Sequence, residues 1–145
     1  MDWNHLREHI QRHEGCVLKP YPCPAGALTI GYGHNLDAKG ITRPVAEIML
    51  DEDLRDAYHE ALHLESPDGA PVFQRLDPVR QEVLVHMVFN LGFAGVLGFT
   101  RMLTALAEGD YERASAEMYD SRWAKQVYGR ANSLAQQMRT GRLSP

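Results

Sequence analysis

Apolar residues repeat with the period of an amphipathic helix through most of this chain. Residues 3–13 form the first such stretch, and Gly15 follows at the position where a helix C-cap belongs. Residues 16–37 break the pattern, because their prolines and glycines exclude a helix and predict a small, irregular β-hairpin region. These residues are Pro20, Pro22, Pro24, Gly26, Gly31 and Gly33.

The helical pattern then returns and continues along the chain. Thr42 as N-cap and Pro44 in the first turn predict a long helix that ends at about Glu65. Asp77-Pro78 begins a second helix, to Leu91, which is apolar nearly all round and therefore typical of a buried central helix. Shorter helices are expected at about 99–108, 110–119 and 129–140. The fold class is therefore α+β and mostly helical.

Length and composition fit one globular catalytic domain over residues 1–145, with 44% hydrophobic and 23% charged residues. We expect an N-terminal lobe of about residues 12–45 with the hairpin. A larger helical lobe would combine residues 66–145 with the first helix. A long helix would connect the two lobes, and a cleft between lobes is a usual place for a ligand.

Charge and hydropathy exclude some functions. A net charge of −4 argues against nucleic-acid binding. Residues 121–145 contain basic but no acidic residues, which fits either a solvated helix or attraction to an anionic polymer such as a cell wall. Residues 83–100 lack charge, but their glycines would break a membrane helix, so we expect no stable membrane insertion. The N-terminus shows no apolar signal-peptide core, and we expect a cytoplasmic protein.

Glu14 is the first candidate for chemistry. It falls at the C-terminal end of the first predicted helix, where the helix dipole disfavours a carboxylate relative to the acid. Glycoside hydrolysis needs such a proton donor for the leaving oxygen. The two cysteines, Cys16 and Cys23, are too few for a disulfide scaffold; a bridge between them is conceivable, but synthesis in the cytosol argues against it.

Motifs around Glu14 resemble a known family. The pattern Glu-Gly, Leu-x-x-Tyr and Gly-x-x-Thr-Ile-Gly-Tyr-Gly-His resembles the active-site stretch of the T-even-phage-type lysozymes, endolysins of glycoside hydrolase family 24. Further motifs fit that family in order along nearly the whole chain. They are Leu76-Asp77-x-Val79-Arg80, Met87-Val88-Phe89-Asn90-Leu91-Gly92, Gly95-Val96-x-Gly98-Phe99-Thr100, Ser121-Arg122-Trp123, Arg130-Ala131 and Arg139-Thr140-Gly141.

The resemblance implies a two-lobed fold and hydrolysis of the β-1,4 bond between N-acetylmuramic acid and N-acetylglucosamine in bacterial peptidoglycan. It assigns the acid to Glu14 and a water-positioning hydroxyl to Thr29. The second catalytic residue, usually Asp in the family, falls on Cys23, which would act either as a base or as a nucleophile. The loop from His34 to Thr42 is also short for the family.

The resemblance also assigns residues around the reaction site. Met102 and Glu117 differ in type from the family pattern, Phe89 also fits a core aromatic, and Trp123 is expected in the core. His34 would pair with Asp53, and Arg130 would lie near Glu14. The residues expected to line the glycan are Asn35, Phe89, Asn90, Met102 and Glu117.

Two other functions remain open from the sequence: a peptidoglycan-binding module without activity, because the usual Asp is missing, and a related glycosidase acting on chitin-type polymers. No metal or organic cofactor is implied. The leading hypothesis predicts a monomeric endolysin that reaches the wall after a holin-type pore has permeabilised the membrane.

Overall fold

The computed structural model describes all 145 residues, which form two compact units, Met1–Met49 and Leu50–Pro145. Eight α-helices and one three-stranded antiparallel sheet make up the chain. This content confirms the predicted mostly helical α+β class. Each unit is described by itself below, and the predicted lobe boundaries, including the placement of the first helix, stay a prediction.

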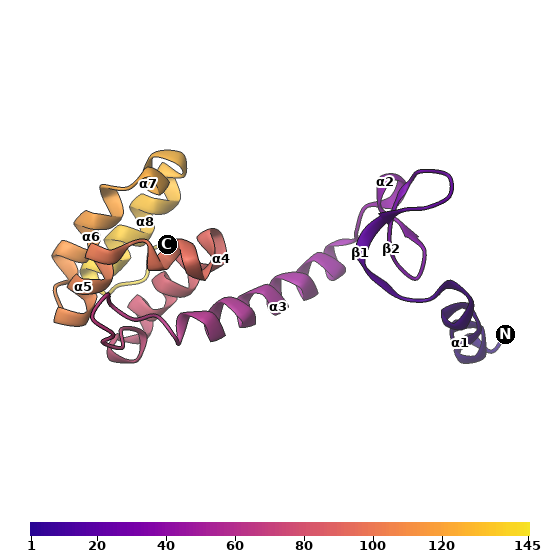
Figure 1. Ribbon diagram of the computed structural model, residues 1–145, viewed down its shortest axis with the longest axis horizontal. Coiled ribbons are helices and arrows are strands. Elements are labelled where there is room, and N and C mark those ends of the chain that lie inside the picture. Colours follow the sequence, from indigo (N-terminus) through magenta and orange to yellow (C-terminus); the bar gives the residue numbers. More distant parts are fainter. The chain divides into compact units, whose positions relative to one another are not determined.

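The N-terminal unit begins with helix α1 (Trp3–Glu14), which the Asp2 side chain caps by accepting hydrogen bonds from two backbone N–H groups. The helix ends at Gly15, as its sequence predicts. Strands β1 (Val17–Pro22), β2 (Leu28–Gly31) and β3 (His34–Asn35) follow in the order β1-β2-β3, and the short helix α2 (Leu36–Lys39) comes directly after them. Figure 1 shows this hairpin region beside α2.

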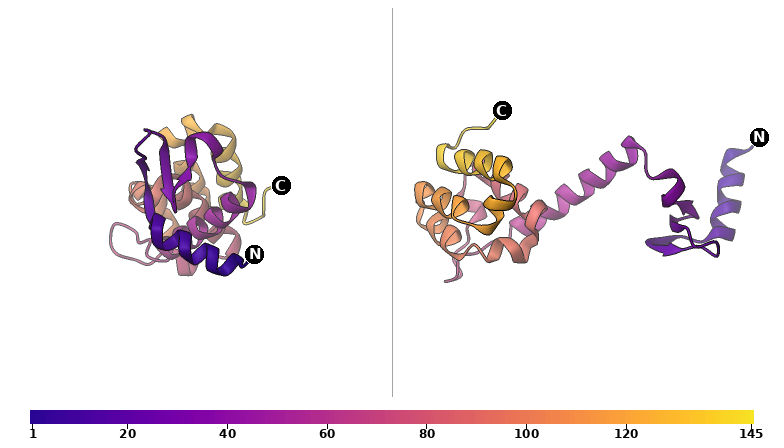
Figure 2. Two further views of the ribbon diagram at one scale, coloured as in Figure 1. Left: turned by 90° about the vertical axis from the view of Figure 1, so that its right-hand side faces the viewer. Right: turned by 90° about the horizontal axis from the view of Figure 1, so that it is seen from above.

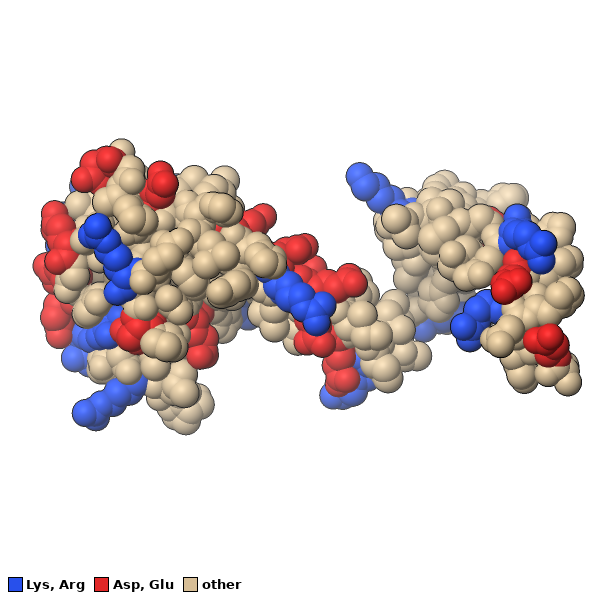
Figure 3. Space-filling model, turned by 90° about the horizontal axis from the view of Figure 1, so that it is seen from below, with Lys and Arg blue, Asp and Glu red and all other residues tan.

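Helix α3 (Arg43–Ala61) is four residues shorter than predicted. The hydrogen bonds tighten beyond it, because the N–H groups of His63 and Leu64 bond three residues back, to Glu60 and Ala61. A turn that begins at Ser66 follows, and the helical hydrogen bonding of α3 does not continue beyond it. Acidic side chains are visible along this helix in Figure 3.

The C-terminal unit contains the 3₁₀ turn η1 (Phe73–Arg75) and helices α4 (Pro78–Leu97), α5 (Thr100–Glu108), α6 (Tyr111–Tyr119), α7 (Arg122–Gln126) and α8 (Tyr128–Thr140). Helix α4 is interrupted at Gly92, whose φ of 76° and ψ of 162° are open to glycine. This break agrees with the predicted end of the central helix at Leu91. The five-residue helix α7 was not predicted.

The core of this unit forms around α4, where Val83, Leu84, Met87 and Val88 are buried. The prediction of a buried central helix is confirmed. Helix α8 packs against α4, α6 packs alongside α8, and α5 and α7 pack against α6 and α8 respectively, and the right-hand view of Figure 2 shows these helices as one cluster. No single helix has the length and apolar character needed to cross a membrane; only α4 and α5 taken together, bent by 99°, meet that test.

Arg80 at the start of α4 holds the far end of α8. Its guanidinium donates to the carbonyl oxygens of Met138 at 2.7 Å and Arg139 at 3.1 Å, two acceptors that the helix end leaves without a partner. It also pairs with the Asp77 carboxylate at 2.6 Å and lies 3.7 Å from the ring centroid of Tyr111. One side chain therefore fixes α4, α6 and α8 together.

Candidate active site

Glu14 is the last residue of α1 and lies against the turn between β2 and β3. A Cβ atom added at Gly33 would lie 3.1 Å from the Glu14 carboxylate oxygen Oε2, closer than ordinary van der Waals contact. Gly33 also has a φ of 74°, which residues with a side chain rarely adopt. Both the backbone conformation and the space beside Glu14 therefore require glycine at this position.

Cys23 lies in the tight turn between β1 and β2. The turn is closed by a 2.9 Å hydrogen bond from the Cys23 N–H to the Ala27 carbonyl oxygen and a 2.7 Å bond from the Gly26 N–H to the Cys23 carbonyl oxygen. Thr29 on β2 is 4% exposed, and its hydroxyl donates to the Ala27 carbonyl oxygen at 2.9 Å. Cys23 and Thr29 are thus anchored on the same backbone segment.

The surroundings of Cys23 make its thiol easier to ionise than that of a free cysteine. Hydrogen bonding from the Ala27 backbone is the main cause that holds the pKa of the Cys23 thiol below its ordinary value, and partial burial opposes it. The Ala25 backbone, the Thr29 hydroxyl and the Gly26 backbone lower the pKa further. Because Thr29 has one hydroxyl proton, donation to Ala27 and donation to the sulfur are alternatives. A thiol at this turn is therefore activated by its own loop.

The structure argues against a bridge between the two cysteines, which are both free thiols. Cys16 immediately precedes strand β1 and Cys23 immediately follows it. A strand of this length spans about 20 Å at roughly 3.3 Å per residue. A disulfide needs Cα atoms within about 7 Å of each other, so the bridge would require β1 to unfold.

Two further predicted residues, His34 and Asn35, form strand β3, and their side chains already have local partners. The Asn35 side-chain oxygen caps α2 by accepting from the Ala38 N–H at 2.9 Å. The His34 Nε2 lies 2.6 Å from the Gly40 carbonyl oxygen, which can only accept, so this nitrogen carries the proton. Asp53, its predicted partner, lies on α3 in the other unit, and the pairing stays a prediction.

The C-terminal unit contains a pocket of about 400 Å³ between the end of α4 and helices α5, α6 and α7. Met102 from α5 and Glu117 from α6, both predicted to line the glycan, belong to its wall, but Met102 is fully buried there. Phe99 and Trp123 supply an aromatic part, with ring centroids 6.2 Å apart in an edge-to-face arrangement. Sequence spacing did not reveal this grouping, because its members come from separate helices.

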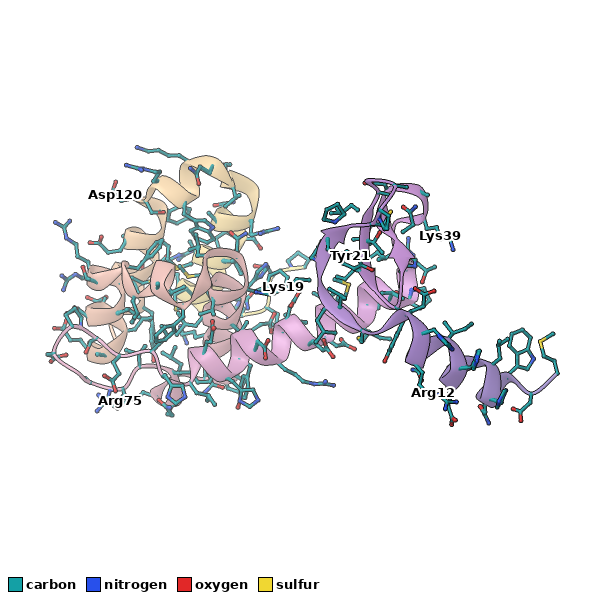
Figure 4. The ribbon with its side chains drawn as sticks, turned by 45° about the vertical axis from the view of Figure 1, so that its right-hand side comes forward. Arg12, Lys19, Tyr21, Lys39, Arg75 and Asp120 are labelled. Carbon is teal, nitrogen blue, oxygen red and sulfur yellow. The ribbon has the colours of Figure 1, made fainter.

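The remaining charged residues of this pocket were not singled out from the sequence. They are Arg101, Asp120 and Arg122, and Figure 4 marks Asp120 at the end of α6. Neither these three side chains nor Glu117 forms an ion pair within the chain. The pocket therefore offers both signs of charge around an apolar wall. Ser121-Arg122-Trp123 was the motif that could have indicated it.

Phe89 and Asn90 lie outside this pocket. Phe89 is 41% exposed, which does not fit its alternative interpretation as a core aromatic. The Asn90 side-chain oxygen accepts a 2.7 Å hydrogen bond from the Trp123 indole N–H, and Trp123 itself is buried as predicted. Asn90 thus positions an aromatic residue of the pocket wall.

Arg130 is exposed near the start of α8, and it influences His86 on α4. Burial is the main cause that lowers the pKa of His86, and the positive charge of Arg130 lowers it further, against an opposing effect of Glu82. His86 was not singled out from the sequence. Burial and the nearby Arg130 charge therefore favour the neutral form of the His86 imidazole.

Known proteins share this sequence over most of its length. The family model described as phage lysozyme matches residues 11–140. An endolysin of Acyrthosiphon pisum secondary endosymbiont phage 1 is 38% identical, with 86% of this chain and 82% of that protein covered. Probable T4-type lysozyme 1 of Dictyostelium discoideum is 26% identical over 96% of both chains.

A third relative is much longer. The pre-baseplate central spike protein Gp5 of Enterobacteria phage T4 is 31% identical over 95% of this chain, but the chain spans only 28% of that protein's length. The same kind of sequence therefore occurs both alone and within a larger protein. Since the family model covers far more than half of the residues, the chain belongs to the phage lysozyme family and is a glycoside hydrolase of the lysozyme type.

Proposed function

We propose that this chain hydrolyses the β-1,4 bond between N-acetylmuramic acid and N-acetylglucosamine in peptidoglycan, with Glu14 as the acid and Cys23 and Thr29 as its catalytic partners. The observation that carries this proposal is the turn from Cys23 to Thr29, whose hydrogen bonds lower the pKa of the thiol in the motif frame of the phage lysozyme family. An inert binding module would have no use for an activated thiol.

In the proposed reaction, Glu14 donates a proton to the leaving glycosidic oxygen as its bond to the anomeric carbon breaks. Its carboxylate lies where the absent side chain of Gly33 leaves room for it. If Cys23 acts as the nucleophile, the same carboxylate then removes a proton from the water that displaces the sulfur, and Glu14 thereby returns to its acid form. If Cys23 acts as the base, the thiol takes the proton of the water, and Glu14 is reprotonated from solvent.

Cys23 supplies the second group. As a nucleophile, its thiolate attacks the anomeric carbon while the carbon–oxygen bond breaks, and water later displaces the sulfur, with net retention. As a base, it takes a proton from a water that attacks the opposite face of the sugar, with inversion. We favour the nucleophile, because sulfur accepts hydrogen bonds weakly and holds a water less well than a carboxylate does. A lowered thiol pKa supports this role.

The glycan strand would extend over further residues. Glu117 lies in the wall of the pocket, which supports its assignment as a glycan contact, whereas Met102 is fully buried in that wall and would act by shaping it. Asn35 would act from the start of α2, and Phe89 offers an exposed ring for a sugar face. Asn90 would act through Trp123. His34, Asp53 and Arg130 are proposed as supporting residues.

Variants of the two catalytic positions test this proposal on purified bacterial cell walls. Glu14→Gln should lose at least about a hundredfold in rate, the usual contribution of a general acid. Cys23→Ser should lose most activity, and Cys23→Asp should recover it. Cys16→Ser, which removes the other thiol, is the matched control and should keep the parent rate. Clearance by Glu14→Gln at the parent rate would refute the assignment of the acid.

Product analysis separates the remaining alternatives. Reducing-end muramic acid in the digest identifies a muramidase, whereas cleavage of chitin oligomers without wall cleavage would identify the chitin-type glycosidase. The anomer released first distinguishes retention from inversion, and therefore nucleophile from base. Full activity in Cys23→Ser would leave Cys23 without a chemical role.

The partners of the enzyme follow from where its substrate lies. We propose a monomer made in the cytoplasm that reaches the wall after a holin-type pore opens the membrane. Expression alone should leave bacterial cells intact, and chloroform should then lyse them. Lysis without any permeabilisation would contradict this route.

A further inference from the structure

Helix α1 carries three histidines in a row, a feature that the proposed hydrolysis does not use. His5, His9 and His13 are four residues apart and therefore lie along one face of the helix. All three are exposed. The ring centroids of His9 and His13 are 4.6 Å apart and the rings meet edge to face, at 63°. Those of His5 and His9 are 6.1 Å apart and nearly parallel, at 15°.

The His9–His13 spacing suits a shared metal ion. Two imidazole nitrogens on one tetrahedral zinc lie about 3.3 Å apart, as bonds of about 2.0 Å require. Rings with centroids 4.6 Å apart reach that separation through small side-chain rotations, because both side chains are exposed. Two histidines one helical turn apart are also the pair that a helix presents to zinc in metal sites of other proteins.

We propose that His9 and His13 form a chelating site for a divalent transition-metal ion, with Zn²⁺ and Cu²⁺ as the ions to test. No group of three or more His, Cys, Asp or Glu side chains gathers around a common centre in this chain. The pair therefore supplies two ligands, and water completes the coordination sphere. Imidazole suits both ions, and Cu²⁺ should bind more tightly than Zn²⁺.

The neighbouring charges on α1 leave the pair accessible. Arg12, labelled on α1 in Figure 4, donates from its Nε to the Glu8 carbonyl oxygen at 3.3 Å. This bond ties its side chain to the helix backbone rather than to the histidine rings. No ion pair involves His9 or His13. Both imidazoles can therefore be offered to a metal without breaking a contact to an acid.

Outside α1, His59 and His63 form a further pair of histidines with the same spacing. Helix α3 ends at Ala61 between them, and the backbone tightens at His63. The His59 ring lies against Tyr58, with ring centroids 5.7 Å apart. The two pairs thus have equal spacing in sequence but different backbone support, which makes His59/His63 the matched comparison.

Titration of untagged protein with CuCl₂ and ZnCl₂, followed by calorimetry, tests the proposal. The parent should bind one Cu²⁺ at the His9–His13 site, with an electron paramagnetic resonance spectrum that shows coupling to nitrogen. His9→Ala should weaken binding at least about tenfold, because it leaves no two histidines one turn apart on this helix. His13→Ala should also weaken binding, because the remaining His5 and His9 rings are nearly parallel with centroids 6.1 Å apart, a poorer arrangement for a shared ion. His5→Ala and His59→Ala/His63→Ala should bind as the parent does.

The variants also define the results that would overturn the site. Parent-like affinity in His9→Ala/His13→Ala would place the metal elsewhere or exclude a site. Loss in His59→Ala/His63→Ala alone would assign binding to that pair. Equal loss in His5→Ala and His9→Ala, with His13→Ala unaffected, would move the chelate one turn toward the N-terminus. Circular dichroism of each variant excludes loss of helix as the cause.

Discussion

Replacement of Gly33 by alanine tests whether the contact between Glu14 and the β2–β3 turn matters for catalysis. The added Cβ would lie 3.1 Å from the Glu14 Oε2. Ordinary contacts begin at 3.4 Å, so the carboxylate must move by roughly 0.3 Å. A misplacement of a catalytic group by about 1 Å costs about a hundredfold in rate. If the added activation free energy scales with the displacement, a shift of roughly 0.3 Å predicts a loss of about fourfold in rate.

Backbone strain acts on the same variant and must be separated from displacement of the acid. Gly33 has a φ of 74°, and alanine in this region costs about 1–2 kcal/mol. Gly31→Ala is the matched control, since Gly31, the last residue of β2 before this turn, has a φ of 66° but nothing within 4 Å of an added Cβ. Both variants should lower the melting temperature to a similar degree.

Only the alanine variant at Gly33 should lose rate beyond what its stability explains. The assay is the initial rate of cell-wall clearance at a temperature where both variants are fully folded. Equal rates for Gly33→Ala and Gly31→Ala would refute the reasoning, because the acid would then tolerate displacement from the position seen here. A larger loss in Gly31→Ala would point to the turn conformation instead of the carboxylate.

Other properties of the structure are open to direct measurement. In a Cys16→Ser background, the rate of Cys23 alkylation should reach half its maximum at a lower pH in the folded protein than in urea, because hydrogen bonds lower the thiol pKa. A half-maximal pH in the folded protein equal to or above that in urea would contradict this prediction. Burial raises the pKa of the Asp77 carboxyl, but hydrogen bonds and the charge of Arg80 outweigh this effect, so the pKa in the folded protein is lowered. The ionised carboxylate therefore stabilises the fold, and this contribution is lost as the pH falls through the pKa that Asp77 has in the folded protein. The stability gap between the parent and Asp77→Asn in urea unfolding should therefore narrow on acidification below about pH 4; a constant gap would contradict it. Met87→Ala should cost about 2–5 kcal/mol of unfolding free energy, because Met87 is fully buried; a loss below about 1 kcal/mol would mean that the core collapses around the vacancy.

Local signals predicted most of the elements. Gly15, Asp77-Pro78 and the prolines of residues 16–37 act through their own backbone geometry, and the corresponding ends and strands were found where expected. The end of α3 was predicted too late, because Leu62 and Leu64 continue the apolar pattern after the backbone has tightened. Helix α7 was missed because five residues are too few for a periodic pattern.

The site was predictable only where one stretch of chain carries it. Glu14, Cys23 and Thr29 lie within sixteen residues, and their motif was visible from the sequence. The lowered pKa of the Cys23 thiol could not be predicted from the sequence, because it depends on the positions of the backbone groups of the turn around the sulfur. Asn90 shows the same limit, since its bond to Trp123 joins residues 33 positions apart. No local pattern reports such a contact.

The bonds from Arg80 to the end of α8 have a consequence for synthesis of the chain. The Arg139 carbonyl is 59 residues beyond Arg80. At about 5–20 residues per second, the ribosome needs roughly 3–12 s to deliver it. During that interval α4 has emerged without α8, so its apolar side chains lack part of their cover. The nascent helical unit should therefore be a client for a chaperone that binds exposed apolar helices, and it should be most sensitive to proteases in those seconds.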